Sequence, residues 1–367
     1  MSATHGSSAP IWRVYAPPLA ALALFGLEHA HLVNAEAPWV AVLAGVLLLG
    51  SVFSAVHHAE VVALKVGEPF GSVLLALAVT VIEASLIVTS MLSATGATEN
   101  ALARDSVYAA AMIVLSGVVG VCLLVGGARY REQEFRVAGT GSALSVLATL
   151  AVLTLVLPNY TLAKLGPQYS PTQLIFVSVL SLLLYFVFVF VQSVRHRDYF
   201  LPEGASDIGE EAEPPSGRET AVSAVMLVVS LLAVVLLAET LAESIEAAIH
   251  AAHLPPSFLG VVIAALVLLP ESVAAIKAAR ANHLQTSLNL ALGSALACIG
   301  LTIPVVAGVS LYLGRGLTLG LDAENTALLL LTLFVSSMTL ATGRATILQG
   351  AVHLVIFGVF MLLAAVP

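Results

Sequence analysis

The chain has 367 residues, of which 59% are hydrophobic and only 10% are charged, and its formal net charge is −8. Soluble domains carry about 25% charged residues, so this chain has too few polar groups to cover a surface exposed to water. Its two cysteines, Cys122 and Cys298, lie in apolar segments and fit neither a disulfide framework nor a zinc pattern. The composition predicts an integral membrane protein, and the long apolar runs favour helices over a β-barrel.

A membrane-spanning helix needs about 20 apolar residues, and 11 segments of the chain have this character. The predicted helices lie near 14–32, 38–56, 72–93, 106–127, 138–158, 171–194, 220–240, 257–279, 286–311, 324–342 and 345–366. The apolar run of the first is short enough to resemble a signal-peptide core, but the loop charges favour a helix. The sequence therefore predicts an all-α polytopic membrane protein.

The distribution of Lys and Arg predicts the orientation of these helices, because cytoplasmic loops carry an excess of positive charge. With a cytoplasmic N-terminus, the predicted helices place the C-terminus outside. Of the 14 basic residues, only Arg104, Lys164 and Arg315 then lie outside. The polar segment 195–219 is acidic and contains Pro and Gly, which is typical of a disordered linker, and this topology places it in the cytoplasm.

Two acidic residues lie deep inside apolar runs, where a carboxylate costs roughly 2.5 kcal/mol or more on insertion scales. Glu83 lies in ALAVTVIEASLIVTSML, residues 76–92, and Glu271 lies in GVVIAALVLLPESVAAIKAARA, residues 260–281. A shift of 188 residues places Glu83 on Glu271 and matches Val73, Ala76 and Val79 to identical residues. The two glutamates fall in the third and eighth predicted helices, which cross the membrane in opposite directions.

An inverted-topology repeat accounts for this placement, because such repeats bring corresponding residues together near the bilayer midplane. The second to sixth helices would form one half, and the seventh to eleventh helices would form the other. The predicted organisation is an N-terminus with the first helix at 1–37, a first half at 38–194, an acidic linker at 195–219 and an inverted second half at 220–367.

Two facing carboxylates can hold one divalent cation through hard oxygen ligands, as calcium prefers. They can instead take up two protons, which carry the same charge as one divalent ion. A site that holds either load and opens to each side of the membrane in turn is that of an antiporter. On this interpretation the charge of Glu83 or Glu271 is always compensated, by a cation or by a proton.

Four segments carry a family resemblance: GEPFGSVLLALAVTVIEASLI at 67–87, RDSVYAAAMIV at 104–114, LVLLPESVAAIKAARANHLQTSLNLALGSALACIGLTIPVV at 266–306 and GRATILQGAVHL at 343–354. They resemble the calcium/cation antiporter superfamily, in particular the bacterial ChaA-like cation/proton exchangers of the CAX type. The resemblance implies a bacterial plasma (inner) membrane protein that exports Ca²⁺, Na⁺ or K⁺ for H⁺. For the acidic linker it implies a sensor of cytosolic calcium as the alternative to a simple solubilising linker.

The resemblance assigns cation and proton binding to Glu83 and Glu271. The superfamily motif Gly-Asn-x-x-Glu lacks its Asn in both repeats here, although Thr80 keeps a hydroxyl at that position in the first. Ser116 and Ser294, on the spans after each glutamate, are further hydroxyl ligands or interhelical hydrogen-bonding groups. The predicted metal ligands are thus Glu83, Glu271, Thr80, Ser116 and Ser294. With fewer side-chain oxygens than a calcium-dedicated exchanger, the alternative is monovalent-only Na⁺(K⁺)/H⁺ antiport.

Most of the other polar residues have two possible interpretations each. Ser287 and Asn289 are weaker ligand candidates or interhelical hydrogen-bonding groups. An external cation funnel or a solvated helix end is predicted for Glu239, Glu243 and Glu246. A proton relay or a solvated loop is predicted for His57, His58, Glu60 and Glu68. Interface chemistry is expected of Glu28, His29 and His31.

Competing classes of protein fit the sequence less well. A channel usually lines its path with rings of ligands from an oligomer, unlike one acid in each half. GTGSALS at 139–145 superficially resembles the serine motif of an intramembrane enzyme, but no suitable His or Asp partner is evident. No Walker motif supports an ATP-driven pump. We therefore expect no cofactor and no nucleic acid, with inorganic cations, protons and the lipid bilayer as partners and the oligomeric state open.

Overall fold

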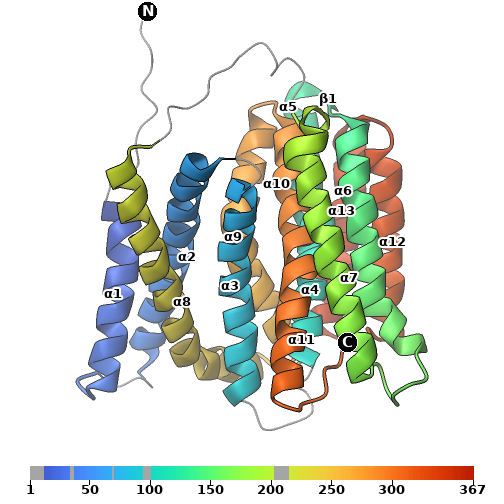
Figure 1. Cartoon of the computed structure of the whole chain (residues 1–367). Coiled ribbons are helices and arrows are strands. Elements are labelled where there is room, and N and C mark those ends of the chain that lie inside the picture. The colour runs from blue at the N-terminus through green and yellow to red at the C-terminus, as the bar shows by residue number, and fades with distance from the viewer. Residues whose placement is uncertain (1–11, 34–36, 68–69, 94–100, 202–214) are drawn as a thin grey trace, which may run out of the picture. The chain divides into compact units, whose positions relative to one another are not determined.

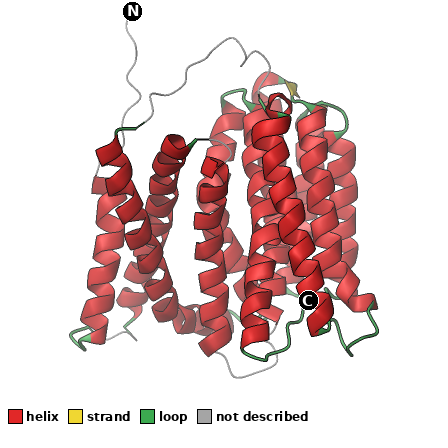
Figure 2. Cartoon of the chain, in the orientation of Figure 1, coloured by secondary structure: helices red, strands yellow, loops and turns green. Residues whose placement is uncertain are grey.

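The computed structural model describes residues 12–33, 37–67, 70–93, 101–201 and 215–367. Most of these residues are helical, and the named strands among them are β1 and β2 (Figure 2). The chain forms two compact units. The first comprises Met1–Thr89 with Glu213–Ala248, and the second comprises Ser90–Ala212 with Ile249–Pro367. Each unit is described by itself.

The first unit contains α1 (Trp12–His29), α2 (Pro38–Val66), and most of α3 (Phe70–Ser93) and α8 (Gly217–Ala251). Pro38 begins α2 at a position where a missing backbone N–H has no cost. Ser54 of α2 donates its hydroxyl to the carbonyl of Val14 at 2.5 Å, and its Oγ lies 2.9 Å from that of Ser230. These contacts tie α1, α2 and α8 together within an otherwise apolar interior.

The second unit contains the remaining elements. They are α4 (Leu102–Met112), α5 (Val119–Tyr130), β1 (Gln133–Glu134), α6 (Val137–Ala151), α7 (Pro171–Phe190), α9 (Phe258–Arg280), α10 (Leu284–Ala297), α11 (Ile303–Tyr312), α12 (Ala323–Leu340), β2 (Arg344–Ala345) and α13 (Ile347–Ala365). Helix α6 contacts α7, α10 and α12, and α12 contacts α13 (Figure 1). Ser170 and Gln173 form a capping box that begins α7.

Short π-helical segments lie within two of the long helical spans of this unit and near the end of two others. They are Ile113–Val118 between α4 and α5, Val152–Val156 after α6, Val191–Arg195 after α7, and Cys298–Thr302 between α10 and α11. The spans Leu102–Tyr130 and Leu284–Tyr312 are therefore each continuous over 29 residues. Both contain one of these segments near the middle.

All 11 predicted membrane segments coincide with helices. Within the described ranges, nine helices are long and apolar enough to cross a membrane. The predicted segment 14–32 corresponds to α1, which contains Pro17 and Pro18 and is not among the nine. The predicted segment 72–93 corresponds to α3, in which Val73–Thr89 is a shorter apolar helix. The all-helical membrane fold is confirmed, and the count of eleven spans stays a prediction.

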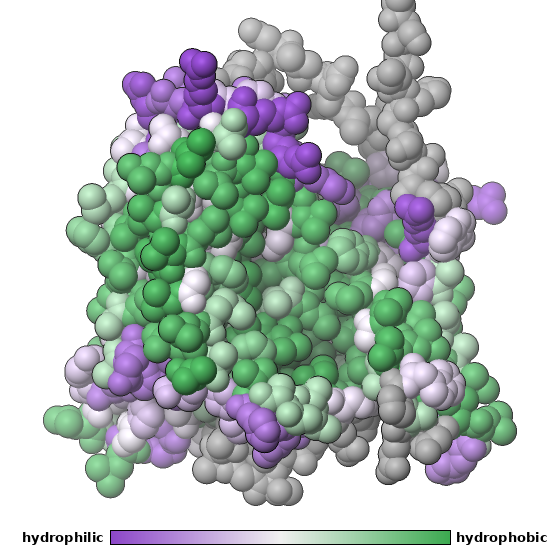
Figure 3. All heavy atoms as spheres, turned by 180° about the vertical axis from the view of Figure 1, so that it is seen from behind, coloured by the Kyte–Doolittle hydropathy of each residue, from purple (hydrophilic) through white to green (hydrophobic). Residues whose placement is uncertain are grey.

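The outer surfaces of the helices suit a lipid environment. On the face in Figure 3, hydrophobic side chains cover the helices between ends where hydrophilic side chains gather. Helix α7 exposes more than half of the surface of Ile175, Phe176, Val179 and Leu183. Large contiguous apolar surfaces are rare on soluble monomers, so these side chains face hydrocarbon.

Glycines allow α5 and α13 to pack closely. A Cβ placed on Gly350 would lie 2.4 Å from the backbone nitrogen of Leu124, and one placed on Gly127 would lie 2.6 Å from that of Ile347. Small residues at such contacts let membrane helices approach backbone to backbone. This packing places α13 directly against the π-helical segment Ile113–Val118.

Two backbone pairings in the second unit support the predicted internal repeat. Strand β1 pairs antiparallel with β2, with Gln133 opposite Ala345, and an isolated antiparallel bridge joins Gln168 to Thr318. In the predicted halves, each pairing joins the loop after the third helix of one half to the loop before the fifth helix of the other. If the two halves are inverted copies of each other, a pairing between them should occur twice, with the roles of the halves exchanged. The boundaries of the halves themselves stay a prediction.

Candidate cation-binding site

Glu83 lies inside α3 and is buried, with 2% of its surface exposed. Thr80, which precedes it by three residues, is 3% exposed and donates its hydroxyl to the carbonyl of Ala76 at 2.8 Å. Residues at this spacing are neighbours on the helix surface, so the carboxylate and the hydroxyl oxygen share a face of α3. The Thr80 proton is used within the helix, and the oxygen keeps lone pairs that can bind a cation.

Glu271 lies inside α9 and is half-buried. It follows Pro270, which has no backbone N–H and so deprives a carbonyl one turn earlier of its usual helical donor. The next residue, Ser272, donates its hydroxyl to the carbonyl of Leu268 at 2.6 Å. Carboxylate and carbonyl oxygens, which hard cations accept as ligands, are therefore close together along this stretch of helix.

Ser116 is fully buried in the π-helical segment Ile113–Val118. Its hydroxyl donates to the carbonyl of Met112 in its own helix, so its oxygen, like that of Thr80, keeps lone pairs. Single π-helical turns within α-helices are rare and occur frequently at functional sites. The widened turn thus marks this span as more than a lipid-crossing helix.

Helix α9 runs beside α4 and α5 in the same direction. At one end, a Cβ placed on Gly260 would lie 2.7 Å from the carbonyl carbon of Asp105. At the other end, the hydroxyl of Tyr130 donates to the carbonyl of Arg280 at 3.0 Å. The first of these contacts is a reference point for the depth of the site residues.

The second unit brings three predicted ligands to a similar depth. Glu271 and Ser116 each follow the first contact by 11 residues, which is about 16 Å along a helix. Helix α10 returns beside α9 after the turn at 281–283, which brings Ser294 back to this depth. Both α9 and α10 contact the π-helical segment. Glu83 and Thr80 belong to the first unit, and the pairing of Glu83 with Glu271 stays a prediction.

The weaker ligand candidates are buried or engaged in structural bonds. Asn289 donates its amide to the carbonyl of Phe200 at 2.5 Å, and its Oδ1 accepts from Gln285 Nε2 at 2.9 Å. Ser287 is fully buried in α10. In the first unit, Glu28 Oε2 accepts from the hydroxyl of Thr240 at 3.1 Å. The bonds of Asn289 favour its interhelical interpretation.

Several predicted residues lie outside the described part of the chain. They are Glu68, the side chains of Glu239 and Glu243, and residues 202–214 of the acidic linker. Among the described ones, His58 is fully buried in α2, with its ring centroid 5.1 Å from that of Tyr15, whereas His57 and Glu60 are exposed. A proton relay through these histidines and the neighbouring acids stays a prediction.

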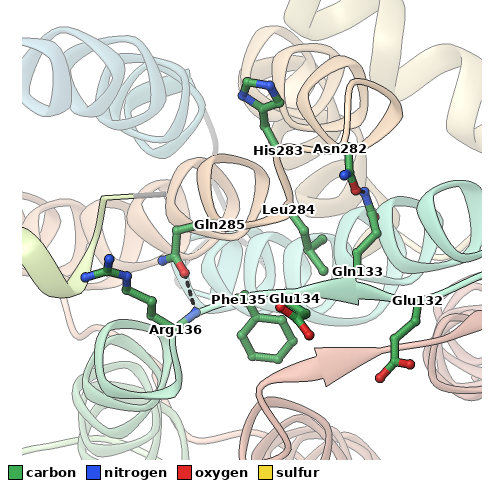
Figure 4. A pocket seen from close by; sticks show the side chains of 9 residues that line it. All are labelled: Glu132, Gln133, Glu134, Phe135, Arg136, Asn282, His283, Leu284 and Gln285. Carbon is green, nitrogen blue, oxygen red and sulfur yellow. Dashed lines mark hydrogen bonds between the residues drawn. The ribbon is translucent and has the colours of Figure 1, made fainter. Parts of the chain in front are cut away.

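A pocket of about 430 Å³ lies where β1 meets the turn between α9 and α10 (Figure 4). Gln285 Oε1 accepts from the backbone N–H of Arg136 at 2.7 Å, and Gln133 Nε2 donates to Asn282 Oδ1 at 2.9 Å. Among the described residues, no three His, Cys, Asp or Glu side chains converge as in a metal site. These bonds hold the start of α10, which carries Ser294, against the connection between α5 and α6.

Sequence reasoning missed one buried titratable residue in this unit. His353 of α13 is fully buried, and its Nδ1 lies 2.7 Å from the carbonyl oxygen of Leu115 in the π-helical segment. The sequence signal for it is a single histidine within the 19-residue apolar helix Ile347–Ala365. An intramembrane ionisable residue of this kind is a functional candidate.

Known proteins are similar to this chain in sequence or in fold. A Sinorhizobium fredii (strain NBRC 101917 / NGR234) protein, y4hA, whose name describes an ionic transporter, is 48% identical over 362 residues, covering 98% of this chain and 97% of that protein. The sodium-potassium/proton antiporter ChaA of Escherichia coli (strain K12) is 36% identical over 324 residues, covering 87% of each chain. A crystal structure of the Ca²⁺/H⁺ antiporter protein YfkE has a TM-score of 0.72 at 16% identity, covering 96% of this chain and 99% of that one.

A family model also matches most of the chain. Its description is sodium/calcium exchanger protein, and it matches residues 36–194 and 222–366. The two matched parts contain Glu83 and Glu271 respectively, and the acidic linker lies between them. The chain therefore belongs to the sodium/calcium exchanger protein family.

Proposed function

We propose that this protein is a secondary cation/proton antiporter that exports Ca²⁺ in exchange for H⁺ by alternating access. The observation that carries the proposal is one glutamate inside an apolar helix of each predicted half, Glu83 in α3 and Glu271 in α9. A charged side chain in a membrane helix is costly and marks an ion pathway by default. The names of two similar proteins, a sodium-potassium/proton antiporter and a Ca²⁺/H⁺ antiporter, support cation/proton exchange.

In the proposed mechanism the two glutamates hold either a cation or protons. The hydroxyl oxygens of Thr80, Ser116 and Ser294 complete the coordination of the cation. When the cation leaves, protons neutralise the carboxylates, so the empty site can turn to the other side of the membrane without carrying buried charge. No covalent bond is made or broken, so the protein is a transporter and not an enzyme, and we propose no resident cofactor.

The proposed location is a bacterial plasma (inner) membrane. The distribution of Lys and Arg supports a cytoplasmic N-terminus, a cytoplasmic acidic linker and an external C-terminus. In this orientation the pocket between β1 and the α9–α10 turn lies on the cytoplasmic side. Export of cations then runs from that side outward, driven by inward proton flow.

A monovalent-only Na⁺(K⁺)/H⁺ antiporter is the second candidate. The absence of the motif Asn in both repeats removes two amide oxygens, and only Thr80 replaces one of them with a hydroxyl, because Leu268 has no side-chain oxygen. Calcium takes six to eight oxygen ligands, so a site with fewer of them favours a monovalent ion. The name of the Escherichia coli relative is consistent with this candidate. A cation channel fits less well than either antiporter.

Ion-driven proton release from acid-loaded inverted membrane vesicles tests the proposal. Ca²⁺, Na⁺ and K⁺ are added in turn to vesicles with the wild type, Glu83→Gln or Glu271→Gln. We expect alkalinisation with Ca²⁺ that falls to background in both variants, since each removes a titratable ligand. Glu324→Gln, at an exposed position in the first turn of α12, is the control for loss of a carboxylate and should behave as the wild type.

Each other outcome has a definite meaning. A response to Na⁺ or K⁺ without one to Ca²⁺ would select the monovalent candidate. Cation flux without proton flux would favour a channel. Full exchange in either glutamate variant would exclude the proposed site.

A further inference from the structure

The π-helical segment Ile113–Val118 releases one backbone carbonyl from its helix. In an α-helix the N–H of Val119 would bond to the carbonyl of Leu115. Here it bonds to the carbonyl of Val114 instead. Leu115 is 1% exposed, so bulk solvent does not supply a donor. A buried carbonyl without one costs about 1–3 kcal/mol, and the fold therefore has to provide a donor.

His353 of α13 is that donor. Its Nδ1 lies 2.7 Å from the Leu115 carbonyl oxygen, and its Nε2 lies 3.1 Å from the hydroxyl oxygen of Thr339 on α12. A carbonyl only accepts hydrogen bonds, so Nδ1 carries the proton. In the neutral imidazole Nε2 is then an acceptor, and the Thr339 hydroxyl donates to it. Both ring nitrogens have partners, which fixes one tautomer and one ring orientation.

Glycines make this link short enough to form. A Cβ placed on Gly120 would lie 3.1 Å from the Cβ of His353, and one placed on Gly117 would lie 3.1 Å from the ring of Phe357. Both glycines belong to the span that carries Ser116. Their lack of side chains lets α13 approach the widened turn until the imidazole reaches the released carbonyl.

The held carbonyl is directly connected to a predicted ligand. The Leu115 carbonyl and the Ser116 N–H belong to the same planar peptide unit. A hydrogen bond that fixes the direction of the carbonyl therefore fixes the backbone plane that leads into Ser116. The direction of the Ser116 hydroxyl follows from that plane and from its own bond to the Met112 carbonyl.

We propose that His353 is a positioning residue of the cation site. Its bond to Leu115 keeps the π-helical turn open and directs the Ser116 oxygen to the depth of Glu271. Thr339 supports this role by donating its hydroxyl to Nε2 and so orienting the ring, while the bond to Leu115 keeps the proton on Nδ1. The inference rests on the proposed function, because Ser116 has to be a cation ligand for its direction to matter to transport.

A side chain also donates to a released carbonyl at a second π-helical turn in the chain. In the π-helical segment Val152–Val156, the N–H of Leu157 bonds to the carbonyl of Val152, which releases the carbonyl of Leu153. The hydroxyl of Tyr169 donates to that carbonyl at 2.5 Å. A side-chain donor thus holds a released carbonyl at two π-helical turns, and the turn held by His353 is the one that carries a predicted ligand.

A double-mutant cycle tests whether His353 acts through Ser116. His353→Leu removes the donor, whereas His353→Asn keeps it because the Asn Nδ2 takes the place of Nδ1. Cation-dependent transport is measured in proteoliposomes, with KM and maximal rate determined separately. We expect His353→Leu to raise KM about tenfold, and His353→Asn to stay within about twofold of the wild type. In a Ser116→Ala background His353→Leu should add less than about twofold, since coupled residues are not additive.

A matched control separates positioning from general loss of stability. Ser51 is a buried serine of the first unit whose hydroxyl donates to the carbonyl of Leu47 at 2.8 Å, much as Ser116 donates to Met112. In a Ser51→Ala background the full tenfold effect of His353→Leu should persist. An equal effect in both backgrounds, or an Asn variant as impaired as the Leu variant, would overturn the positioning role.

The tautomer is measured independently of transport. Protein with ¹⁵N-labelled histidine is compared with His353→Asn by nitrogen NMR, so that the difference assigns the His353 signals. We expect a protonated Nδ1 and an unprotonated Nε2, the opposite of the form that neutral imidazole favours in water. Thr339→Val should shift the Nε2 signal and leave Nδ1 protonated. A proton on Nε2 in the wild type would overturn the bond to Leu115.

These outcomes can be told apart from failure of the proposed function. If Glu83→Gln and Glu271→Gln retain full exchange, the cation site is elsewhere and the kinetic cycle has no ligand to report on. The NMR measurement still decides whether His353 holds the Leu115 carbonyl. If the glutamate variants are inactive and the cycle is additive, the antiporter stands and only the role of His353 is excluded.

Discussion

The two π-helical segments inside the 29-residue spans have similar packing and different chemistry. Leu102–Tyr130 contains Ile113–Val118, and Leu284–Tyr312 contains Cys298–Thr302. The first segment packs against α13 and the second against α7. In the predicted halves, each is the third helix of one half packed on the fifth helix of the other.

Aromatic side chains also correspond in the two regions. A Cβ placed on Gly117 would lie 3.1 Å from the ring of Phe357, and one placed on Gly300 would lie 3.0 Å from the Cβ of Tyr185. Each glycine lies within its π-helical segment. The backbone frame is therefore repeated down to the glycine–aromatic contact.

The polar chemistry beside this contact differs. Four residues before Phe357 in α13 lies His353, and four residues before Tyr185 in α7 lies Ser181. His353 bonds to a released carbonyl, whereas the Ser181 hydroxyl has no hydrogen-bond partner among the described residues. The comparison shows that the repeat determines which helices pack together. Single side chains determine which of the two π-helical turns has its released carbonyl hydrogen-bonded.

The largest expected effect is on stability, through the packing of α13 against α5. Gly350→Ala would place a Cβ 2.4 Å from the backbone nitrogen of Leu124, and a backbone atom cannot move aside as a side-chain tip can. We expect α13 to be forced away from α5, with a loss of about 3 kcal/mol of stability. Thermal unfolding of the detergent-solubilised protein measures this loss.

Two further glycine variants sharpen that test. Gly300→Ala would place a Cβ 3.0 Å from the Cβ of Tyr185, and it should lower stability less than Gly350→Ala does. Gly308→Ala is the control, because no atom lies within 4 Å of its added Cβ, and alanine in a helix should be neutral or slightly stabilising. Equal unfolding temperatures for Gly350→Ala and Gly308→Ala would contradict the close contact between α5 and α13.

Much of this fold was predictable because membrane helices are recognisable in a sequence as long apolar runs. The predicted helix at 171–194 matches the span Pro171–Arg195 almost residue for residue, since Ser170 and Pro171 begin it with standard cap chemistry. The family resemblance drawn from four segments of the sequence is confirmed. An apolar run does not indicate where a helix widens into a π-helical turn, because the sequence of Ile113–Val118 is that of an ordinary apolar helix.

The site was predictable only in part. Glu271 was predicted because it is an acidic residue inside an apolar run, and Ser116 and Ser294 were predicted because they lie on the spans that follow the two glutamates. The second unit brings all three to a similar depth. His353 was missed because its partner carbonyl, in Leu115, lies 238 residues away in sequence. Only tertiary packing creates that pair, and no local pattern signals it.

A second prediction concerns the hydroxyl at each widened turn. Ser116→Ala should raise the KM for the transported cation about tenfold, equivalent to about 1.4 kcal/mol of binding. Ala297 is the residue that the repeat places opposite Ser116 in sequence, and Ala297→Ser should leave KM within about twofold of the wild type. The reason is that no imidazole directs a hydroxyl at the second turn. A large fall in KM for Ala297→Ser would show that the two turns are functionally equivalent.

The smallest expected effect concerns Tyr169, which holds the other released carbonyl. Burial raises the pKa of Tyr169 to about 12, against about 10 for an exposed tyrosine. Its contribution to stability is therefore complete below about pH 10 and falls as the pH rises towards 12, because the unfolded chain ionises first. Tyr169→Phe loses the bond to the Leu153 carbonyl, which costs about 1 kcal/mol at neutral pH.

The same variant also removes this residue's part of the alkaline destabilisation. Unfolding temperatures measured in detergent from pH 7 to pH 12 should start lower for Tyr169→Phe and fall less steeply above pH 10. Tyr160→Phe is the control, because that side chain is 70% exposed and its loss should leave both the starting value and the slope unchanged. If Tyr169→Phe had the same unfolding temperature as the wild type at neutral pH, the bond to the Leu153 carbonyl would contribute nothing to stability. The π-helical turn at Val152–Val156 would then be stable without a side-chain donor, which would weaken the parallel case for His353.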